Sequence, residues 1–125
     1  MINFKTLKPL WFRSPQLEPD ETTEWSVAAN RQQGGRAVGG LLTLTSSRLI
    51  FTANRMDAAL AGDDWSVPRE AVNDSTVSQM TLAGGPFTGG LRRRLRVELA
   101  GGIHELFVVR DPAQASSRLT ALLAS

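Results

Sequence analysis

Apolar and polar residues alternate along several short stretches of this chain, and this alternation constrains its fold more than any other feature. The cleanest stretch spans residues 91–99, in which Leu95 and Val97 face one way while Arg94 and Arg96 face the other. Successive side chains of a β-strand point to opposite faces of its sheet, so this pattern predicts a strand with one buried face. We therefore expect a mainly β fold.

Glycine, proline and small polar residues separate these stretches and mark the turns. Gly34 and Gly35 provide one turn, and Ser46 and Ser47 provide another. Pro68 ends a short strand because proline cannot donate to a sheet ladder. The apolar run of the last strand predicts burial on both of its faces. We expect strands at residues 24–29, 36–45, 48–53, 65–67, 72–82, 91–99 and 103–109, an irregularity at 73–75, and a loop with room for one helical turn at 54–63.

The C-terminal segment has the pattern of one amphipathic helix. Asp111 is a suitable N-cap, and Pro112 fits the first turn, where its missing N–H costs nothing. Leu119, Leu122 and Leu123 then form an i, i+3, i+4 stripe to bury. Seven antiparallel strands and this helix predict a split barrel or sandwich of two nearly orthogonal sheets, capped by the helix.

The chain has the size of a single domain at 125 residues. We place an N-terminal arm at residues 1–16 and the domain at residues 17–125. The apolar residues of the arm are compatible with one helical face, although Pro9 interrupts it. Two interpretations stay open: the arm packs over the domain as a strap, or it touches a membrane interface through Trp11 and Phe12.

Few residues in the chain could carry catalysis or hold a metal. It contains no cysteine and a single histidine, His104, so disulfides, thiolate sites and hydrolytic zinc chemistry are not expected. His104 and Glu105 are strand neighbours and point to opposite faces. Adjacent carboxylates at Asp63 and Asp64 rarely converge on calcium without further ligands. We expect no enzymatic activity and no cofactor.

Charge and hydropathy narrow the range of partners. The net charge is only +2, and no aromatic residues alternate with the arginines of residues 92–96, so nucleic acid is not an expected ligand. No run of about 18 apolar residues is present, so no transmembrane segment is expected. Arginine is preferred over lysine, and alanine and glycine are frequent, which favours a bacterial source. We expect a cytoplasmic protein.

Several segments together resemble the GRAM family, in its bacterial form, within the pleckstrin-homology-like (PH-like) superfold. The similar segments are Leu-Glu-Pro-Asp-Glu at 17–21, Gly-Leu-Leu-Thr-Leu-Thr at 40–45 leading into Arg-Leu-Ile-Phe at 48–51, Trp-Ser-Val-Pro at 65–68, Leu-Arg-Val-Glu-Leu at 95–99 and Phe-Val-Val at 107–109. The resemblance spans about residues 17–124. These segments are structural, so the resemblance implies a fold more than a ligand.

Members of this superfold bind phosphoinositides, other lipids, peptides or proteins. The resemblance implies that lipid-binding residues gather where the loops after the first, third and sixth strands converge. Arg31, Arg36 and Arg55 are the candidates there, with His104 near the third loop. Asp57, Asp63 and Asp64 at the same end weaken an anion site. No basic residue follows Arg36 into the second strand, which argues against phosphoinositide recognition.

A second group of arginines follows the sixth strand. Arg92, Arg94 and Arg96 share its outward face, and their guanidinium groups could bind an acidic partner, a lipid headgroup or nucleic acid. Alternatively, they form a solvated face that protects a sheet edge from pairing. The sequence leaves both interpretations open.

The sequence therefore predicts a non-catalytic intracellular binding module. It docks a protein partner or acts as a regulatory scaffold through the arginines, the loop at 84–90 or a sheet edge. The alternative is a peripheral membrane module that binds anionic lipid headgroups through surface arginines. The oligomeric state stays open.

Overall fold

The computed structural model describes residues 12–79 and 93–125. Seven strands in these residues form one antiparallel sheet in the order β4-β3-β2-β1-β7-β6-β5. The strands are β1 (Thr23–Gln33), β2 (Arg36–Thr45), β3 (Arg48–Ala53), β4 (Trp65–Pro68), β5 (Val72–Gln79), β6 (Arg93–Leu99) and β7 (His104–Val109). The helices of the described part are α2 (Arg55–Ala59) and α3 (Pro112–Ala124), with short 3₁₀ turns at Arg69–Ala71 and Ala100–Gly102.

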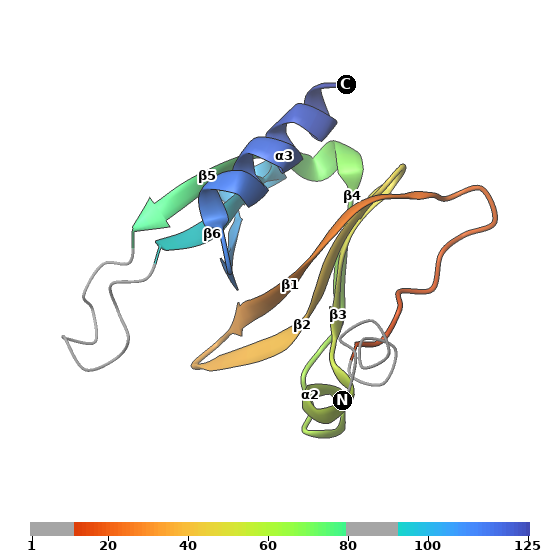
Figure 1. The fold of residues 1–125 in the computed structure, drawn as a ribbon, viewed down its shortest axis with the longest axis vertical. Helices are drawn as coiled ribbons and strands as arrows, with labels where there is room; N and C mark the ends of the chain where they lie inside the picture. The colour runs from red at the N-terminus through yellow and green to blue at the C-terminus, as the bar shows by residue number, and fades with distance from the viewer. Residues whose placement is uncertain (1–11, 80–92) are drawn as a thin grey trace, which may run out of the picture.

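The sheet bends into two halves that meet where β1 pairs with β7 (Figure 1). Consecutive strands pair with each other, and at this junction residues 29–31 lie opposite residues 107–109. The sheet stays open, with β4 and β5 at its two edges. Figure 1 shows α3 lying across β5 and β6, against which it packs. This arrangement confirms the predicted mainly β, PH-like architecture with one C-terminal helix.

The core fills the space between the two halves and α3. Leu42, Leu49 and Phe51 enter it from β2 and β3, and Leu95 and Phe107 enter from β6 and β7, all fully buried. Leu119 of α3 is also fully buried and closes the core from the helix side. The alternation of buried and exposed residues along β1 and β6 follows directly from the period-two sequence pattern.

One glycine is required by close approach of the backbone. A Cβ at Gly40 would lie 2.1 Å from the carbonyl oxygen of Thr52 on the neighbouring strand. No side chain fits that space, so β2 and β3 can approach this closely only because residue 40 has none. The tip of the β1–β2 hairpin uses Gly34 for a different reason, since its φ of 60° is the left-handed conformation that glycine adopts freely.

The boundaries of several elements agree with the sequence predictions. The expected hairpin strands at 36–45 and 48–53 are β2 and β3, and the expected irregularity is a register shift between Val72 and Asp74. Asp111 caps α3 by accepting a hydrogen bond from the amide of Gln114 at 3.1 Å. The helical turn between β3 and β4 is α2. β1 is longer than expected, because it continues to Gln33 and thereby forms the tip of the hairpin.

The prediction that the last strand is buried on both faces was wrong. Only Phe107 and Val109 of β7 are buried, and the outward Leu106 and Val108 are half-buried. The strand therefore has one core face, like its neighbours. Residues 1–11 of the predicted arm, the end of the expected fifth strand at 80–82 and the loop at 84–90 lie outside the described residues. In the described part of the chain, every helix is too short or too polar to cross a membrane.

Candidate functional site

The first predicted cation, Arg31, lies at the end of the core and is neutralised there. It follows Ala29 on the inward face of β1, and its guanidinium donates to both carboxylate oxygens of Glu105 on β7, at 3.3 and 3.1 Å. The two side chains are only 13% and 16% exposed. The guanidinium also stacks 5.4 Å from the ring centroid of Trp65, which itself contacts Phe107. Arg31 therefore closes the core and offers no exposed charge.

The second predicted cation, Arg36, is paired in a similar way. Its guanidinium donates to Asp57 Oδ1 at 3.0 Å and to the carbonyl oxygen of Leu60. Asp57 Oδ2 accepts the backbone amide of Gly39 at 2.9 Å, and the Asp57 amide donates to Asn54. The Gly39 hydrogen bond and the Arg36 guanidinium lower the pKa of Asp57, although burial opposes them. This carboxylate fastens α2 to β2 and neutralises Arg36.

The acidic residues at this end, which the sequence predicted to weaken an anion site, form hydrogen bonds and ion pairs with other residues of the domain. Asp63 exchanges two hydrogen bonds with Gln33, both at 3.1 Å. Asp64 binds Arg13 instead. Arg55, the third predicted cation, is the first residue of α2 and lines a separate groove next to β3 and β4. The loops therefore do not present Arg31, Arg36 and Arg55 as one basic cluster.

Arg94 and Arg96 lie on the outer face of β6, as predicted, and Arg92 lies outside the described residues. Arg94 donates to the side-chain oxygen of Gln32 on β1. Arg96 donates to Glu98, and its second guanidinium nitrogen lies 3.4 Å from Nδ1 of His104. These contacts are lateral, along the sheet surface, and the Arg96 and Glu98 side chains stay 37% and 33% exposed.

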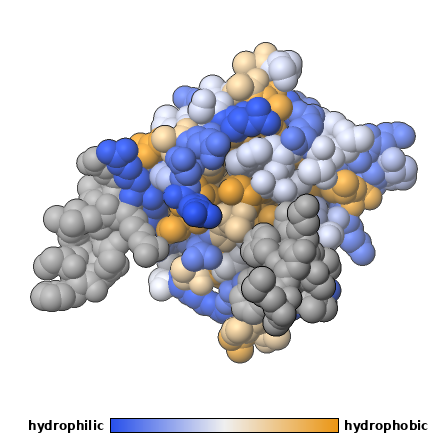
Figure 2. Space-filling model, viewed as in Figure 1, coloured by the Kyte–Doolittle hydropathy of each residue, from blue (hydrophilic) through white to orange (hydrophobic). Residues whose placement is uncertain are grey.

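Aliphatic residues accompany these arginines. Leu106 of β7 lies opposite Arg96 in the strand register, and Val108 follows on the same outer face. We call Arg94, Arg96, Leu106 and Val108 the β6–β7 outer face. On the side of the molecule drawn in Figure 2, the hydrophobic side chains of the described residues lie in small patches bordered by hydrophilic ones.

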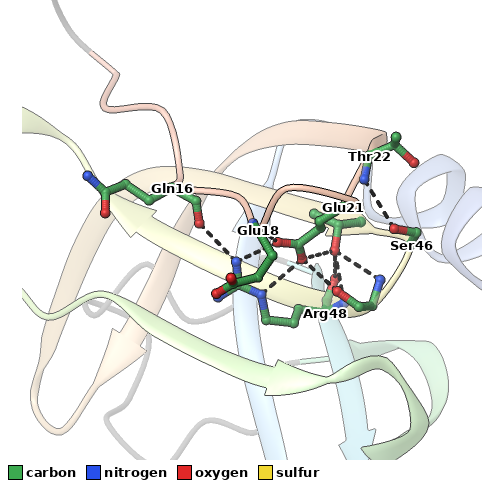
Figure 3. A network of polar contacts seen from close by, with 8 residues as sticks. Gln16, Glu18, Glu21, Thr22, Ser46 and Arg48 are labelled. Atoms are coloured by element: carbon green, nitrogen blue, oxygen red, sulfur yellow. Dashed lines mark hydrogen bonds and ion pairs between the residues drawn. The ribbon is translucent and has the colours of Figure 1, made fainter.

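A dense polar network surrounds Glu21, just before β1 (Figure 3). Glu21 is buried and accepts two hydrogen bonds from the Arg48 guanidinium, at 2.9 and 2.7 Å. The hydroxyls of Thr45 and Ser47 and the amide of Glu18 also donate to it. Arg48 above all, with these donors, holds the pKa of Glu21 far below its ordinary range, although burial alone would raise it. The sequence marked Glu21 only as part of a resembling segment.

The segment before this network forms a strap, residues 12–16, over one face of the sheet. Arg48 donates to the carbonyl oxygen of Gln16 at 2.9 Å. Arg13 binds both oxygens of Asp64, at 2.9 and 3.1 Å, and donates to the carbonyl oxygen of Ala53 at 3.3 Å. The described end of the predicted arm is therefore fixed to β3 and to the loop before β4.

A groove of about 680 Å³ lies between this strap and the outer face of β3 and β4. We call it the strap groove. Its lining includes three guanidinium groups, from Arg13, Arg48 and Arg55, and one carboxylate, from Asp64. Thr52 also lines the groove, and its hydroxyl is buried without a hydrogen-bond partner. In residues 12–79 and 93–125, no cluster of three or more histidine and acidic side chains could hold a metal ion.

Comparisons with known proteins support the fold. No family model matches the chain, and no curated protein matches its sequence. The C-terminal domain of an unknown protein from Leishmania infantum is similar in structure, with a TM-score of 0.62, 18% identity and coverage of 84% of this chain and 86% of that one. The hSac2 domain from the human phosphoinositide phosphatase Sac2 has a TM-score of 0.52, 18% identity and coverage of 86% and 68%.

These likenesses are to the fold alone and agree with a PH-like architecture. Membership of the GRAM family and a bacterial source stay predictions. The words phosphoinositide phosphatase describe that neighbour and not this chain.

Proposed function

We propose that this domain is a non-catalytic binding module that docks an acidic segment of a protein partner on its β6–β7 outer face. The observation that carries the proposal is the internal pairing of Arg31 with Glu105 and of Arg36 with Asp57. A surface that binds anionic lipid needs guanidinium groups that face the membrane. At the end where such groups were expected, the chain supplies their counterions itself.

The β6–β7 outer face has the composition of a protein interface. Arginine is enriched in docking surfaces, and apolar side chains beside it exclude water from its charge-assisted hydrogen bonds. The Arg96–Glu98 pair is partly exposed, so it is weak, and a carboxylate of a partner can replace Glu98 at little cost. Positive charge at Arg94 and Arg96 makes the complementary partner acidic.

The non-catalytic part of the proposal is supported by the bonding of the chemically active groups. His104 is exposed and lies against Arg96, and the Ser75 hydroxyl bonds Ser116 and Thr120. Neither group has the nucleophile and base geometry that covalent catalysis requires.

Site-specific photo-crosslinking in cells tests the docking face. A photo-reactive residue at Thr76, which lies opposite Arg96 in the register of β5 and β6, probes this face. A matched probe at the exposed Ser117 of α3 is the control. We expect one discrete protein adduct from Thr76, absent from Ser117, and lost in Arg94→Glu with Arg96→Glu. The same adduct surviving this double substitution, or no adduct at Thr76, contradicts the proposal.

Vesicle sedimentation of the full chain separates the membrane alternative. Vesicles of neutral lipid and vesicles containing phosphatidylserine are compared at low and high ionic strength. We expect the protein to stay in the supernatant in all four conditions. Salt-sensitive binding to the anionic vesicles, lost in Arg94→Ala with Arg96→Ala, would replace protein docking by membrane attachment.

A further inference from the structure

A second groove, of about 500 Å³, lies between β1 and the first half of α3. We call it the β1–α3 groove. Trp25 and Val27 of β1 line it, and both side chains are half-buried and pack against the core. Ala115 of α3, which is buried, also lines the groove. The groove therefore has an apolar floor that stays partly open to solvent.

Two arginines line the same groove, and both are exposed. Arg110 directly follows β7, and Arg118 belongs to α3. Within residues 12–79 and 93–125, neither guanidinium has a hydrogen bond or an ion pair. Asp111 provides the one carboxylate of the described lining, and it accepts the amide of Gln114 as the N-cap of α3. The groove therefore has a net positive charge, in contrast to the paired Arg31 and Arg36.

The two arginines lie toward opposite ends of the apolar floor. Asp111, Gln114 and Arg118 are spaced by three and four residues, which places them along one face of α3. The helix rises about 10 Å between Asp111 and Arg118. Ala115 lies between them on the helix, and Arg110 immediately precedes Asp111. A ligand in this groove would therefore have an apolar surface beneath it and a cation toward each end.

Arg110 connects this groove to the β6–β7 outer face. It lines the groove and also the neighbouring depression, which Val108 lines as well. Val108 belongs to the outer face on which Arg94 and Arg96 lie. An extended segment that passes along this face would therefore meet Arg110 next, and the β1–α3 groove after it.

We propose that the β1–α3 groove holds a bulky apolar side chain of the acidic partner segment, with acidic residues on both sides of this anchor pairing with Arg110 and Arg118. The inference rests on the proposed docking function and adds the residue that anchors the segment. The apolar anchor would remove water from Trp25 and Val27, while carboxylates meet the two unpaired guanidinium groups. Tryptophan and arginine are the residue types that most often carry the binding energy of protein interfaces.

NMR titration of the full chain with two synthetic peptides tests the anchor. One peptide, Asp-Glu-Asp-Glu-Phe-Asp-Glu with blocked ends, has phenylalanine between acidic residues, and the matched peptide has serine in its place. We expect the phenylalanine peptide to cause saturable shifts of the Trp25 indole and of the Gln114 and Arg118 amides. The Kd of the serine peptide should be about tenfold higher. Equal affinity of the two peptides, or no saturable shift in the groove, would overturn the proposal.

Two variants that each remove one charge separate the groove from general electrostatic attraction. Arg118→Gln should raise the Kd of the phenylalanine peptide about threefold, because it removes one exposed ion pair. Arg55→Gln removes the same charge from the first residue of α2, which does not line the groove, and should leave this Kd unchanged. Both positions are exposed, so both variants should keep the wild-type Tm. An equal rise of Kd in the two variants would contradict the site.

The same titration distinguishes failure of the anchor from failure of the docking function. Shifts at Leu106 and Val108 without shifts at Trp25 would support docking on the β6–β7 outer face and overturn the anchor. Shifts at Trp25 and Arg118 without shifts at Leu106 and Val108 would support the anchor and contradict docking on that face.

Discussion

At the scale of single residues, charged side chains in this domain mostly bind one another rather than face a partner. Arg31, Arg36 and Arg48 each hold a carboxylate of another segment. A buried pair such as Arg31 with Glu105 contributes little net stability, but removal of one member leaves an uncompensated charge. The pairs therefore hold separate segments of the chain together, and removing one member of a pair is expected to lower the free energy of unfolding.

Among these paired residues, Glu21 should have the largest effect on stability when it is replaced. We expect Glu21→Gln to lower the free energy of unfolding by about 2 kcal/mol at neutral pH, because a neutral amide cannot replace the carboxylate opposite Arg48. Urea denaturation measures the loss, and Glu70→Gln, an exposed position in the turn after β4, is the control. A variant as stable as the control would contradict this role.

The effect of Glu21 should also depend on pH. Its pKa in the folded protein lies below the unfolded value of about 4.3, so the unfolded chain binds the proton more readily. The stabilisation is therefore fully present above that unfolded pKa and is lost as pH falls below it. The stability difference between wild type and Glu21→Gln should shrink over that acidic range.

Sequence reasoning found many of these residues but not their partners. Arg31 was a candidate for ligand binding because it lies near the first loop, yet Glu105, its counterion, is 74 positions away along the chain. Only the pairing of β1 with β7 brings them together. The strap groove was missed for the same reason, since Arg13, Arg48 and Thr52 come from segments with no shared motif.

At the scale of elements, α2 shows how one side chain positions a helical turn. Asp57 binds the Gly39 amide and Arg36, both on β2. We expect Asp57→Ala to destabilise this corner by about 1–2 kcal/mol, since two donors lose their acceptor. Hydrogen exchange should report faster exchange at Gly39 and α2, whereas Asp63→Ala should leave Gly39 unchanged. Unchanged exchange at Gly39 in Asp57→Ala would contradict this assignment.

Local patterns predicted most elements because each strand has one core face. The boundaries of β2 and β3 follow from alternation and the Ser46–Ser47 turn. The burial of β7 could not be predicted in the same way. Its apolar residues are compatible with a doubly buried strand, and only the tertiary fold shows that nothing in the described part of the chain fully buries Leu106 and Val108.

At the scale of the whole molecule, Phe107 connects the two halves of the sheet. It lies on β7, and its ring centroid is 6.0 Å from the ring centroids of Phe51 on β3 and Trp65 on β4. We expect Phe107→Ala to lower the free energy of unfolding by about 3–5 kcal/mol. We also expect both halves of the sheet to unfold in one transition. Urea midpoints from amide resonances of β3 and β6 measure this.

The control for this substitution is Val108→Ala, the outward neighbour on the same strand. Its side chain is half-buried, so we expect the loss to be smaller. Different urea midpoints for β3 and β6 in Phe107→Ala would show that the two halves are separate cooperative units, contrary to this expectation.

The pairing of β1 with β7 also has a consequence for the order in which the chain folds. β1 to β4 form a meander of sequence neighbours, and so do β5 to β7, whereas the junction joins residues 29–31 to residues 107–109. Bringing these two distant segments together lowers the entropy of the chain before any contact between them has formed. The two meanders are therefore expected to form early in folding. The pairing of β1 with β7, which joins them over three residues of each strand, is the step expected to limit the folding rate.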